Sequence, residues 1–411
     1  MRIAFVSREY AGVGSGGGIG TYVRNAAQML AARGHDVEVF TDGPQDSRVE
    51  QPGLRVHSIA ADEDDFSRAI AVPFLAAHRE KPFDVIESAE YRADAEIIFD
   101  QAPEVARVVK LHTAAFQLGA MNEAYVTLGA KARFVAGALR RGHIPKRFWG
   151  RYSAKTDPEC RITLLADEIT APSAAILAWT GRVWPIDAER FNVIPNVYVP
   201  SPDMLAARPE GRMPLVVFVG KLEARKGVIE LARAIPKILE AHPNARFRFV
   251  GRTLPHPSTR QSLDETVRQE AGSAALDRLE FTGGVAYPEV AGHLAEAAVA
   301  VFPSYWENYG YVCLEAMAAG CGVVASSTGG MAELISDGDT GLLVPAKDPP
   351  AIARAVIALL RNPAESAIMG TKARSSVLEC YSNDAIAPLQ EASYRRAIVR
   401  ARSRRRASGP E

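Results

Sequence analysis

The chain has 411 residues, of which 47% are hydrophobic and 23% charged, and its formal net charge is zero. This length exceeds a single ordinary core and predicts two or three domains, while the neutral balance excludes a global field that would attract nucleic acid. No run reaches the roughly 18 apolar residues of a membrane span, and the N-terminus shows no signal-peptide pattern, so we expect a cytoplasmic protein. Its four cysteines form no CxxC pair, and we expect them to be free thiols.

Short β-branched runs alternate with helical patterns along the whole chain, which is typical of parallel sheets with crossover helices. In the first half the expected strands are Arg2–Val6, Asp36–Thr41, Arg55–Ile59, Asp84–Ser88, Arg107–His112 and Glu168–Ala171. A helix is expected between the first two, at Ile19–Arg33, because its apolar residues share one face and Gly34 follows as a stop.

A proline-rich stretch at residues 200–214 precedes a second series of the same kind, and we interpret it as a linker. The expected strands there are Pro214–Gly220, Arg246–Val250, Leu279–Thr282, Val299–Pro303, Gly322–Ala325 and Gly341–Val344, with helices that include Val228–Ala241 and Ala351–Arg361. The pattern predicts an α/β protein with two doubly wound Rossmann-like domains. We place the domains at residues 1–197 and 214–382, the linker at 198–213, and a C-terminal helix with a basic tail at 383–411.

The densest candidate site follows the expected strand that ends at Pro303. Glu307 stands in the loop, Gly310 allows the backbone to approach a ligand closely, and a helix expected from Tyr311 carries Glu315. The first turn of that helix offers amide groups and a positive dipole end to a phosphate, and carboxylates accept hydrogen bonds from hydroxyl-rich ligands. Taken singly, either glutamate is more often an ordinary surface residue.

Two further clusters also follow expected strands. Lys221 and Lys226 lie in a loop between Gly220 and Gly227, where two cations could stabilise the charge that develops on a departing diphosphate. Such cations can replace a divalent metal, and since we identify no Asp-x-Asp pair suited to one, we expect no metal and no other cofactor. Alone, this segment would be read as a solvated basic loop. The third cluster, Ser327–Glu333, contains a Gly-Gly turn that opens another helix.

In their order and spacing, these clusters resemble the retaining glycosyltransferases of family 4, which have the GT-B fold. The matching segments are Gly220–Gly227, Glu307–Gly320, Gly329–Glu333 and Gly341–Val344, and Pro195-Asn196 resembles the family's hinge. The resemblance implies two domains that face each other across a cleft and a C-terminal helix that crosses back to the N-terminal domain. It also implies metal-independent transfer of a sugar from a nucleotide-diphosphate sugar, with retention of configuration.

The resemblance extends more loosely to the first half. The segment Gly16–Gly20 resembles the family's glycine loop, which implies that the amides of Gly17 and Gly18 face the donor phosphate. His112 matches a position that contacts the donor sugar, although without the resemblance a histidine at a strand end is more often a satisfied core residue. In a departure from the family, Lys221 stands where arginine is usual, which keeps the charge but loses the bidentate fork.

By the same resemblance, the other candidate residues receive roles at the donor site. Glu315 binds the ribose hydroxyls, and Glu307 contacts the donor sugar. Lys221 and Lys226 hold the diphosphate, with help from the amides of Gly310 and Tyr311. The backbone at Gly284 and Val285 contacts the base. The departing phosphate helps to deprotonate the acceptor, so no base or covalent nucleophile is assigned. Domain closure would exclude water. The acceptor implied is a sugar or a lipid-linked molecule of envelope or exopolysaccharide synthesis.

Two basic regions stand out against the neutral total. Residues 131–155 carry eight Lys and Arg and no Asp or Glu, with aromatic and aliphatic residues between them. This mixture suits an anionic membrane surface, which would place the protein peripherally on the inner face of the membrane, but it fits equally a solvated loop and helix with buried aromatic anchors. The arginines from Arg395 to Arg406 are interpreted as a disordered tail, and no nucleic-acid module accompanies them.

Three alternative functions stay open at this stage. The segment Gly12–Gly17 fits the GxGxxG pattern of a nicotinamide-dependent dehydrogenase, but a lone match is weak and its helix does not open directly after the strand. A phosphorylase or a nucleotide-sugar epimerase could share the fold, although we can assign no lysine to a pyridoxal cofactor. The third alternative is a non-catalytic sugar-binding or scaffold protein, against which the two lysines and two glutamates argue.

Overall fold

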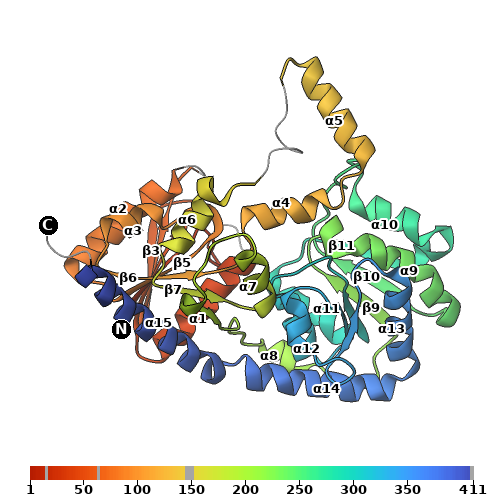
Figure 1. Ribbon diagram of the computed structural model, residues 1–411. Coiled ribbons are helices and arrows are strands. Elements are labelled where there is room, and N and C mark those ends of the chain that lie inside the picture. Colours follow the sequence, from red (N-terminus) through yellow and green to blue (C-terminus); the bar gives the residue numbers. More distant parts are fainter. Residues whose placement is uncertain (14–16, 63–64, 144–151, 408–411) are drawn as a thin grey trace. The chain divides into compact units, whose positions relative to one another are not determined.

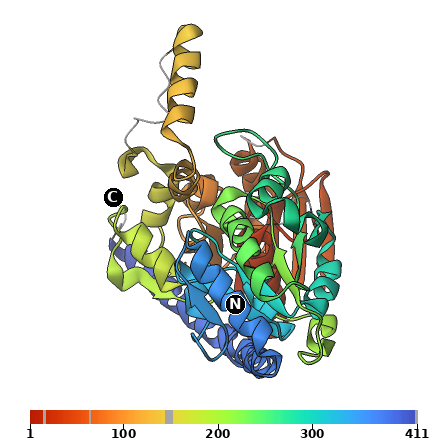
Figure 2. The ribbon, with the colours of Figure 1, turned by 90° about the vertical axis from the view of Figure 1, so that its right-hand side faces the viewer.

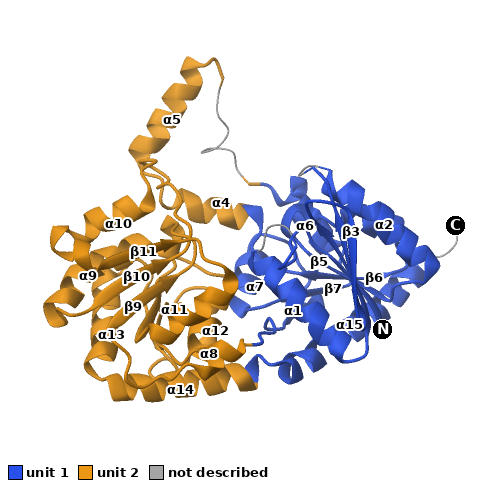
Figure 3. Ribbon diagram, turned by 180° about the vertical axis from the view of Figure 1, so that it is seen from behind, with its two compact units in different colours: residues 1–115, 153–199, 380–411 blue, residues 116–152, 200–379 orange. Residues whose placement is uncertain are grey.

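The structure is a computed structural model that describes residues 1–13, 17–62, 65–143 and 152–407 (Figure 1). It divides into two compact units (Figure 3): unit 1 comprises residues 1–115, 153–199 and 380–411, and unit 2 comprises residues 116–152 and 200–379. Residues 116–152 were expected in the N-terminal domain, whereas in the structure they group with unit 2.

Unit 1 is built on a sheet whose strands have the order β3-β4-β2-β1-β5-β6-β7-β8. The strands are β1 (Arg2–Val6), β2 (Asp36–Asp42), β3 (Ser47–Gln51), β4 (Leu54–Ile59), β5 (Val85–Ala89), β6 (Ala106–Lys110), β7 (Glu168–Ala171) and β8 (Phe191–Val193). Neighbouring strands are parallel except β3, which is antiparallel to β4. The central strands β1 and β6 are buried along their whole length, as expected of a parallel sheet covered on both faces.

The helices of unit 1 connect and cover these strands. They are α1 (Gly18–Ala32), α2 (Phe66–Glu80), α3 (Glu96–Gln101), α6 (Pro158–Leu164), α7 (Ala174–Gly181) and α15 (Asn383–Ala407). Helix α1 packs beside α15, and α2 packs beside α3. The expected apolar face of α1 is confirmed, because Tyr22, Ala26, Met29 and Leu30 are all buried.

Unit 2 is built on a fully parallel sheet with the strand order β11-β10-β9-β12-β13-β14. The strands are β9 (Leu215–Val219), β10 (Arg246–Val250), β11 (Leu279–Gly283), β12 (Val299–Phe302), β13 (Gly322–Ser326) and β14 (Leu342–Val344). Successive side chains of a strand point to opposite faces, and alternate residues such as Val216 and Phe218 contribute to one core shared with α9 and α13.

The helices of unit 2 form two main groups. They are α4 (Ala115–Glu123), α5 (Leu128–Arg140), α8 (Pro202–Ala206), α9 (Val228–Ala241), α10 (Leu263–Ala271), α11 (Val290–Glu296), α12 (Tyr311–Ala318), α13 (Pro349–Arg361) and α14 (Pro363–Cys380). Helices α10 and α13 pack against α9, whereas α8, α11 and α12 pack against one another. Helix α5 projects from unit 2 in both views (Figures 1 and 2), and Ala138 is its single buried residue.

Every expected strand is present, with ends that differ by two residues at most, and the structure adds two short ones, β3 and β8. The stretch at residues 200–214, interpreted as a linker, contains the short helix α8. Its sequence explains this helix, because the Ser201 side chain accepts a hydrogen bond from the amide of Met204 and Pro202 occupies the first helical position.

The interpretation of the C-terminal arginines as a disordered tail is wrong. Helix α15 continues to Ala407 and belongs to unit 1. Arg396 and Arg400 both pair with the fully buried Glu168, and Arg404 pairs with Asp167 at 2.9 Å. Because Glu168 and Asp167 lie at the start of β7, these ion pairs fix the C-terminal helix across the N-terminal sheet.

Both units are therefore doubly wound α/β structures, which confirms the expected fold class. Among the described residues, none of the helices has both the length and the apolar character that crossing a bilayer requires.

Candidate functional site

Unit 2 has a topological switch point between β9 and β12. The chain adds β10 and β11 on one side of β9 and then crosses to build β12, β13 and β14 on the other. In doubly wound sheets, ligands bind beyond the carboxyl ends of the strands at such a point. The loops that follow β9 and β12 hold Lys226 and Glu307, so both residues lie at the position where a ligand is expected.

Lys226 and Glu307 form a direct ion pair. Their side chains are only 19% and 16% exposed, and the two residues are 81 positions apart in the sequence. Burial of Glu307 favours a higher pKa, but the charges of Lys226 and Arg225, together with hydrogen bonds from Lys226 and the Asn308 amide, outweigh it and lower the pKa of Glu307. The carboxylate is therefore ionised near neutral pH, and the ammonium has donors left for a second anionic partner.

Backbone contacts hold the loops after β9 and β12 together. The amide of Tyr305 donates to the carbonyl of Arg225 at 2.8 Å. Gly227 has a φ of 75°, and a Cβ built there would lie 2.0 Å from the carbonyl oxygen of Pro303. Only glycine satisfies both the left-handed backbone and the close approach, so Gly227 keeps Lys226 beside the Glu307 loop.

The Gly-Gly turn after β13 also contacts the backbone of Glu307. The amide of Gly330 donates to the carbonyl of Glu307 at 2.8 Å. A Cβ on Gly329 would lie 2.2 Å from the same carbonyl oxygen. The three clusters singled out in the sequence thus interlock through their backbones at one edge of the sheet.

Glu315 lies in helix α12, which begins directly after Gly310 with Tyr311 as its first residue. Its side chain is buried, and burial raises the pKa of Glu315 to about 7 against the opposing effect of a hydrogen bond with Tyr287. Tyr287 follows β11 by four residues. This contact therefore ties α12 to the loop that contains Gly284 and Val285, the residues expected to contact the base.

The remaining candidates of unit 2 are more open. Lys221 is exposed and directly follows Gly220 at the end of β9, Gly284 is exposed, and Val285 is half-buried. Their loops are linked, because the amide of Gly220 donates to Val250 and the amide of Gly251 donates to Gly283, both at 2.9 Å. The structure thus brings the loops of all eight candidates of unit 2 to the carboxyl edge of one sheet.

In unit 1, His112 lies two residues beyond β6 and is 7% exposed. Its ring meets the ring of Tyr22 edge-on at 5.4 Å. Burial, together with the charge of Lys110, lowers the pKa of His112 to about 3. The imidazole is therefore neutral at physiological pH, which suits a hydrogen-bonding contact better than a proton-donating one.

Gly17 and Gly18 stand at the start of α1, where a carboxylate is already present. The amide of Gly20 lies 3.4 Å from Oε2 of Glu9, and a Cβ on Gly17 would lie 2.3 Å from the same oxygen. A phosphate could reach these amides only if the Glu9 side chain rotated away, because two anions would repel each other there. Gly14 and Gly16 lie outside the described residues.

Several residues that the sequence did not single out shape both sites. In unit 1, the buried carboxyl of Glu90 accepts hydrogen bonds from the His112 amide at 2.9 and 2.8 Å. In unit 2, the ammonium of Lys347 lies 4.4 Å from the Tyr125 ring and 4.3 Å from the Tyr305 ring. No local pattern marks these residues, because each acts through a partner far away in the chain.

The contacts of Tyr125 explain why residues 116–152 group with unit 2. The Tyr125 ring meets the Tyr305 ring edge-on at 6.0 Å, and its carbonyl accepts a hydrogen bond from the Ser258 hydroxyl at 3.0 Å. The basic stretch continues from here into α5, where Leu128 and Leu139 are 84% and 55% exposed. Lys146, Arg147 and Arg151 lie outside the described residues.

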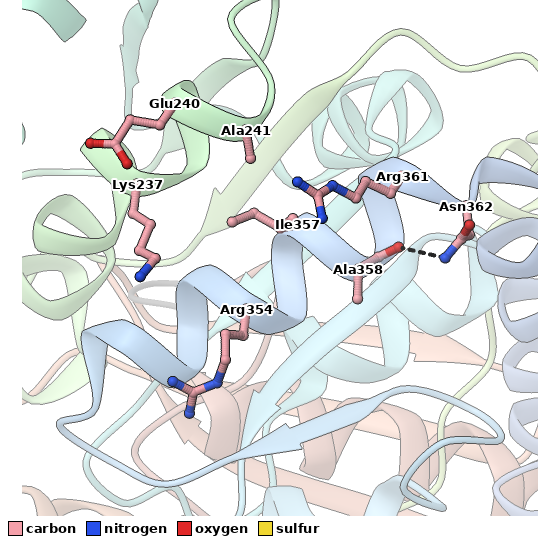
Figure 4. Close-up of a pocket in the computed structure, with 8 residues that line it drawn as sticks. All are labelled: Lys237, Glu240, Ala241, Arg354, Ile357, Ala358, Arg361 and Asn362. Atoms are coloured by element: carbon pink, nitrogen blue, oxygen red, sulfur yellow. Dashed lines mark hydrogen bonds between the residues drawn. The ribbon is translucent and has the colours of Figure 1, made fainter.

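A groove of about 640 Å³ lies between α9 and α13 (Figure 4). It is lined by Lys237, Glu240, Ala241, Arg354, Ile357, Ala358, Arg361 and Asn362. Most of these residues lie in the C-terminal halves of the two helices, and Asn362 directly follows α13. Both helices run back from the carboxyl edge of the sheet. The groove is therefore not part of the candidate site. Within the described ranges, no group of three or more His, Cys, Asp or Glu is arranged to hold a metal ion.

Comparison with known families covers both halves of the chain. The family model described as "Glycosyltransferase Family 4" matches residues 16–201, and the model described as "Glycosyl transferases group 1" matches residues 213–362. The chain belongs to the glycosyltransferases of family 4. Enzymes of this family transfer sugars from nucleotide-sugar donors. Membership of the family therefore replaces the dehydrogenase, phosphorylase, epimerase and non-catalytic alternatives.

Individual relatives agree with this assignment. The chain is 28% identical to a glycogen synthase of Mycobacterium tuberculosis over 394 residues, which span 89% of this chain and 87% of the relative. It is 29% identical to a D-inositol 3-phosphate glycosyltransferase of Acidothermus cellulolyticus over 388 residues, 86% of this chain and 80% of the relative. The solved sucrose-phosphate synthase of Thermosynechococcus elongatus superimposes with a TM-score of 0.72 at 24% identity, covering 97% and 99% of the two chains, and supports the GT-B fold.

Proposed function

We propose that this family 4 enzyme is a retaining, metal-independent glycosyltransferase that moves a sugar from a nucleotide-diphosphate sugar to a sugar or lipid-linked acceptor. The observation that carries the proposal is the half-buried Lys226–Glu307 ion pair at the switch point of unit 2. A fixed cation there can take up the negative charge of a departing diphosphate without a metal ion. The paired carboxylate stays ionised, ready to accept hydrogen bonds from sugar hydroxyls.

In this proposal each candidate residue has one role. Lys221 and Lys226 hold the diphosphate, helped by the amides of Gly310, Tyr311, Gly17 and Gly18. Glu315 binds the ribose, and Gly284 and Val285 contact the base. Glu307 and His112 contact the donor sugar. The departing phosphate accepts the proton of the acceptor hydroxyl, so no side chain acts as a covalent nucleophile. The neutral imidazole of His112 fits a sugar contact.

Metal independence is tested by transfer in the presence of a chelator. A thermal-shift screen over UDP-, GDP-, ADP- and TDP-sugars first identifies the donor, because a ligand that binds only the folded state raises the melting temperature. We then expect the rate of nucleotide-diphosphate release to be unchanged in excess EDTA. Loss of activity in EDTA that magnesium or manganese restores would contradict the proposal.

Binding of the donor should depend on pH through Glu315. The pKa of Glu315 is about 7 in the ligand-free chain, and ribose hydroxyls that donate to its carboxylate favour the ionised form. Affinity should therefore be highest above pH 7 and fall below it by up to about tenfold per pH unit. Calorimetric titration with the selected nucleotide sugar measures this, since the diphosphate of such a donor does not titrate near pH 7.

The variant Glu315→Gln is the control for this titration. It keeps an oxygen that can accept a hydrogen bond but removes the titrating proton, so its affinity should lose the step near pH 7. A step that persists in Glu315→Gln would assign the pH dependence to another group and remove Glu315 from the ribose contact.

We further propose that α5 contacts an anionic membrane surface from the cytoplasmic side. Leu128 and Leu139 are exposed on a helix that also carries Arg133, Arg140 and the adjacent Arg141, the combination that an interfacial helix uses. Flotation with vesicles should show binding to anionic but not to zwitterionic lipid, and weaker binding for Arg140→Glu/Arg141→Glu. Equal behaviour on both vesicle types would contradict a membrane role.

A further inference from the structure

Unit 1 has a switch point of its own, between β1 and β5. The strand order places β2, β4 and β3 on one side of β1 and β5 to β8 on the other. The loops after β1 and β5 are joined there by an ion pair, with Arg8 Nη2 at 2.8 Å from Asp94 Oδ1. Because ligands of doubly wound sheets bind at switch points, the residues between Glu90 and Asp94 are candidates for contact with a ligand.

Two consecutive residues in this loop have a strained backbone. Arg92 has a φ of 60° and Ala93 a φ of 53°, in the left-handed region that costs a residue other than glycine about 1–2 kcal/mol. Glycine at either position would remove the strain. Backbone strain of this kind persists only where the surroundings enforce it, and it is concentrated at functional sites.

Here the strained turn is enforced by a buried carboxylate from outside the loop. Glu159, in the first turn of α6, is 4% exposed. Its Oε1 accepts a hydrogen bond from the Arg92 amide at 2.9 Å, and its Oε2 accepts one from the Ala115 amide at 2.7 Å. A single side chain thus fixes the loop after β5 to the segment after β6.

A second buried carboxyl group, that of Glu90, completes this arrangement, and burial raises its pKa to about 8. The single N–H of the His112 amide is shared between the two carboxyl oxygens of Glu90, and the amide of Ala93 donates to the Glu90 carbonyl at 2.9 Å. The strained turn and His112 are therefore held as one rigid piece. The turn buries Ala93 and leaves the Arg92 side chain exposed at the switch point.

We propose that Arg92 binds an anionic group, a phosphate or a carboxylate, of the acceptor, and that Glu159 is the positioning residue that fixes the Arg92 turn. The inference rests on the proposed function and adds to it that the acceptor binds at the switch point of unit 1. A guanidinium is always charged and presents a planar fork of donors that matches both groups. A turn held by buried hydrogen bonds fixes the backbone from which this side chain extends, which reduces the ordering required on binding.

The test uses pairs of ligands that differ by one anionic group. The full chain is titrated calorimetrically with glucose and glucose 6-phosphate, fructose and fructose 6-phosphate, inositol and inositol 1-phosphate, and, for the carboxylate, glucuronate. We expect at least one anionic member to bind more tightly than its neutral counterpart. In Arg92→Ala that preference should fall by about ten- to hundredfold, the value of a hydrogen-bonded charge contact, whereas Arg92→Lys should retain part of it.

Two further variants separate recognition from folding. Ala93→Gly relaxes the turn but keeps the guanidinium, so it should weaken anion binding less than Arg92→Ala and should not lower the melting temperature. Glu159→Gln should weaken anion binding while the affinity for the nucleotide sugar stays at the wild-type value. Equal anion affinity in Arg92→Ala and wild type, or no anionic preference in the wild type, would overturn the inference.

The proposed function is checked separately in the same proteins. If donor binding is normal and anion recognition is absent, the inference fails and the proposed function stands. If no nucleotide sugar binds the wild type, the proposed function fails, whatever the result with the anionic sugars.

Discussion

Replacement of Glu307 by alanine is expected to reduce transfer by about 100- to 1,000-fold, the loss typical of removing one preorganised electrostatic contact at a reacting centre. The variant removes the carboxylate proposed to contact the donor sugar and leaves Lys226 without its ion-pair partner. The fold should survive, because the contact that anchors the loop is made by the Glu307 carbonyl and not by its side chain. Initial rates of nucleotide release and a thermal melt measure the two effects.

A matched control is available on the surface of the same unit. Asp339 pairs with Lys372 at 2.6 Å, and both side chains are about half exposed. Because exposed ion pairs contribute little, Asp339→Ala should leave both turnover and the melting temperature unchanged. Turnover that is unchanged in Glu307→Ala as well would remove Glu307 from the site.

The variant with the largest expected effect on stability is Gly227→Ala. The new Cβ would have to occupy a position 2.0 Å from the carbonyl oxygen of Pro303, on a residue with a φ of 75°. The loops after β9 and β12 must then separate, which should destabilise the fold by about 4 kcal/mol or more and displace Lys226 from Glu307. Denaturant titration gives the free energy of unfolding, and donor titration shows whether the remaining folded protein still binds.

Gly338→Ala separates the two causes of this effect. Gly338 has a nearly equal φ of 78°, but a Cβ there would meet no atom within 4 Å. It should therefore show only the backbone strain of about 1–2 kcal/mol. If Gly227→Ala were no more destabilised than Gly338→Ala, the close contact between the two loops would not contribute to stability.

Much of the fold could be predicted because it is encoded locally. The buried strands β1 and β9 appear in the sequence as short β-branched runs, and the left-handed glycines mark the turns that follow strands. Strand β3 was missed because Ser47–Gln51 is exposed along its whole length and has no apolar alternation. It forms as an antiparallel edge strand only because β4 is beside it.

The parts that could not be predicted depend on partners far away in the chain. The arginines of α15 have the composition of a solvated tail, and their contacts with the buried Glu168 and Asp167, more than 200 positions earlier, make them structural. In the same way, the resemblance placed Lys226 and Glu307 in one site, but nothing local showed that they pair directly. Glu159 has no sequence signal as a support for Arg92, because its two hydrogen bonds go to backbone amides.

The grouping of residues 116–152 with unit 2 has a practical consequence for dissecting the enzyme. The chain passes between the units at residues 115–116, 152–153, 199–200 and 379–380, so no single cut yields two complete halves. A gene fragment that encodes only residues 200–379 would produce the part that holds the proposed donor site, but Tyr305, Lys347 and Ser258 would lack Tyr125 there. Recombinant versions of that part should therefore retain residues 116–152, for instance by fusing them ahead of residue 200, if they are to remain soluble.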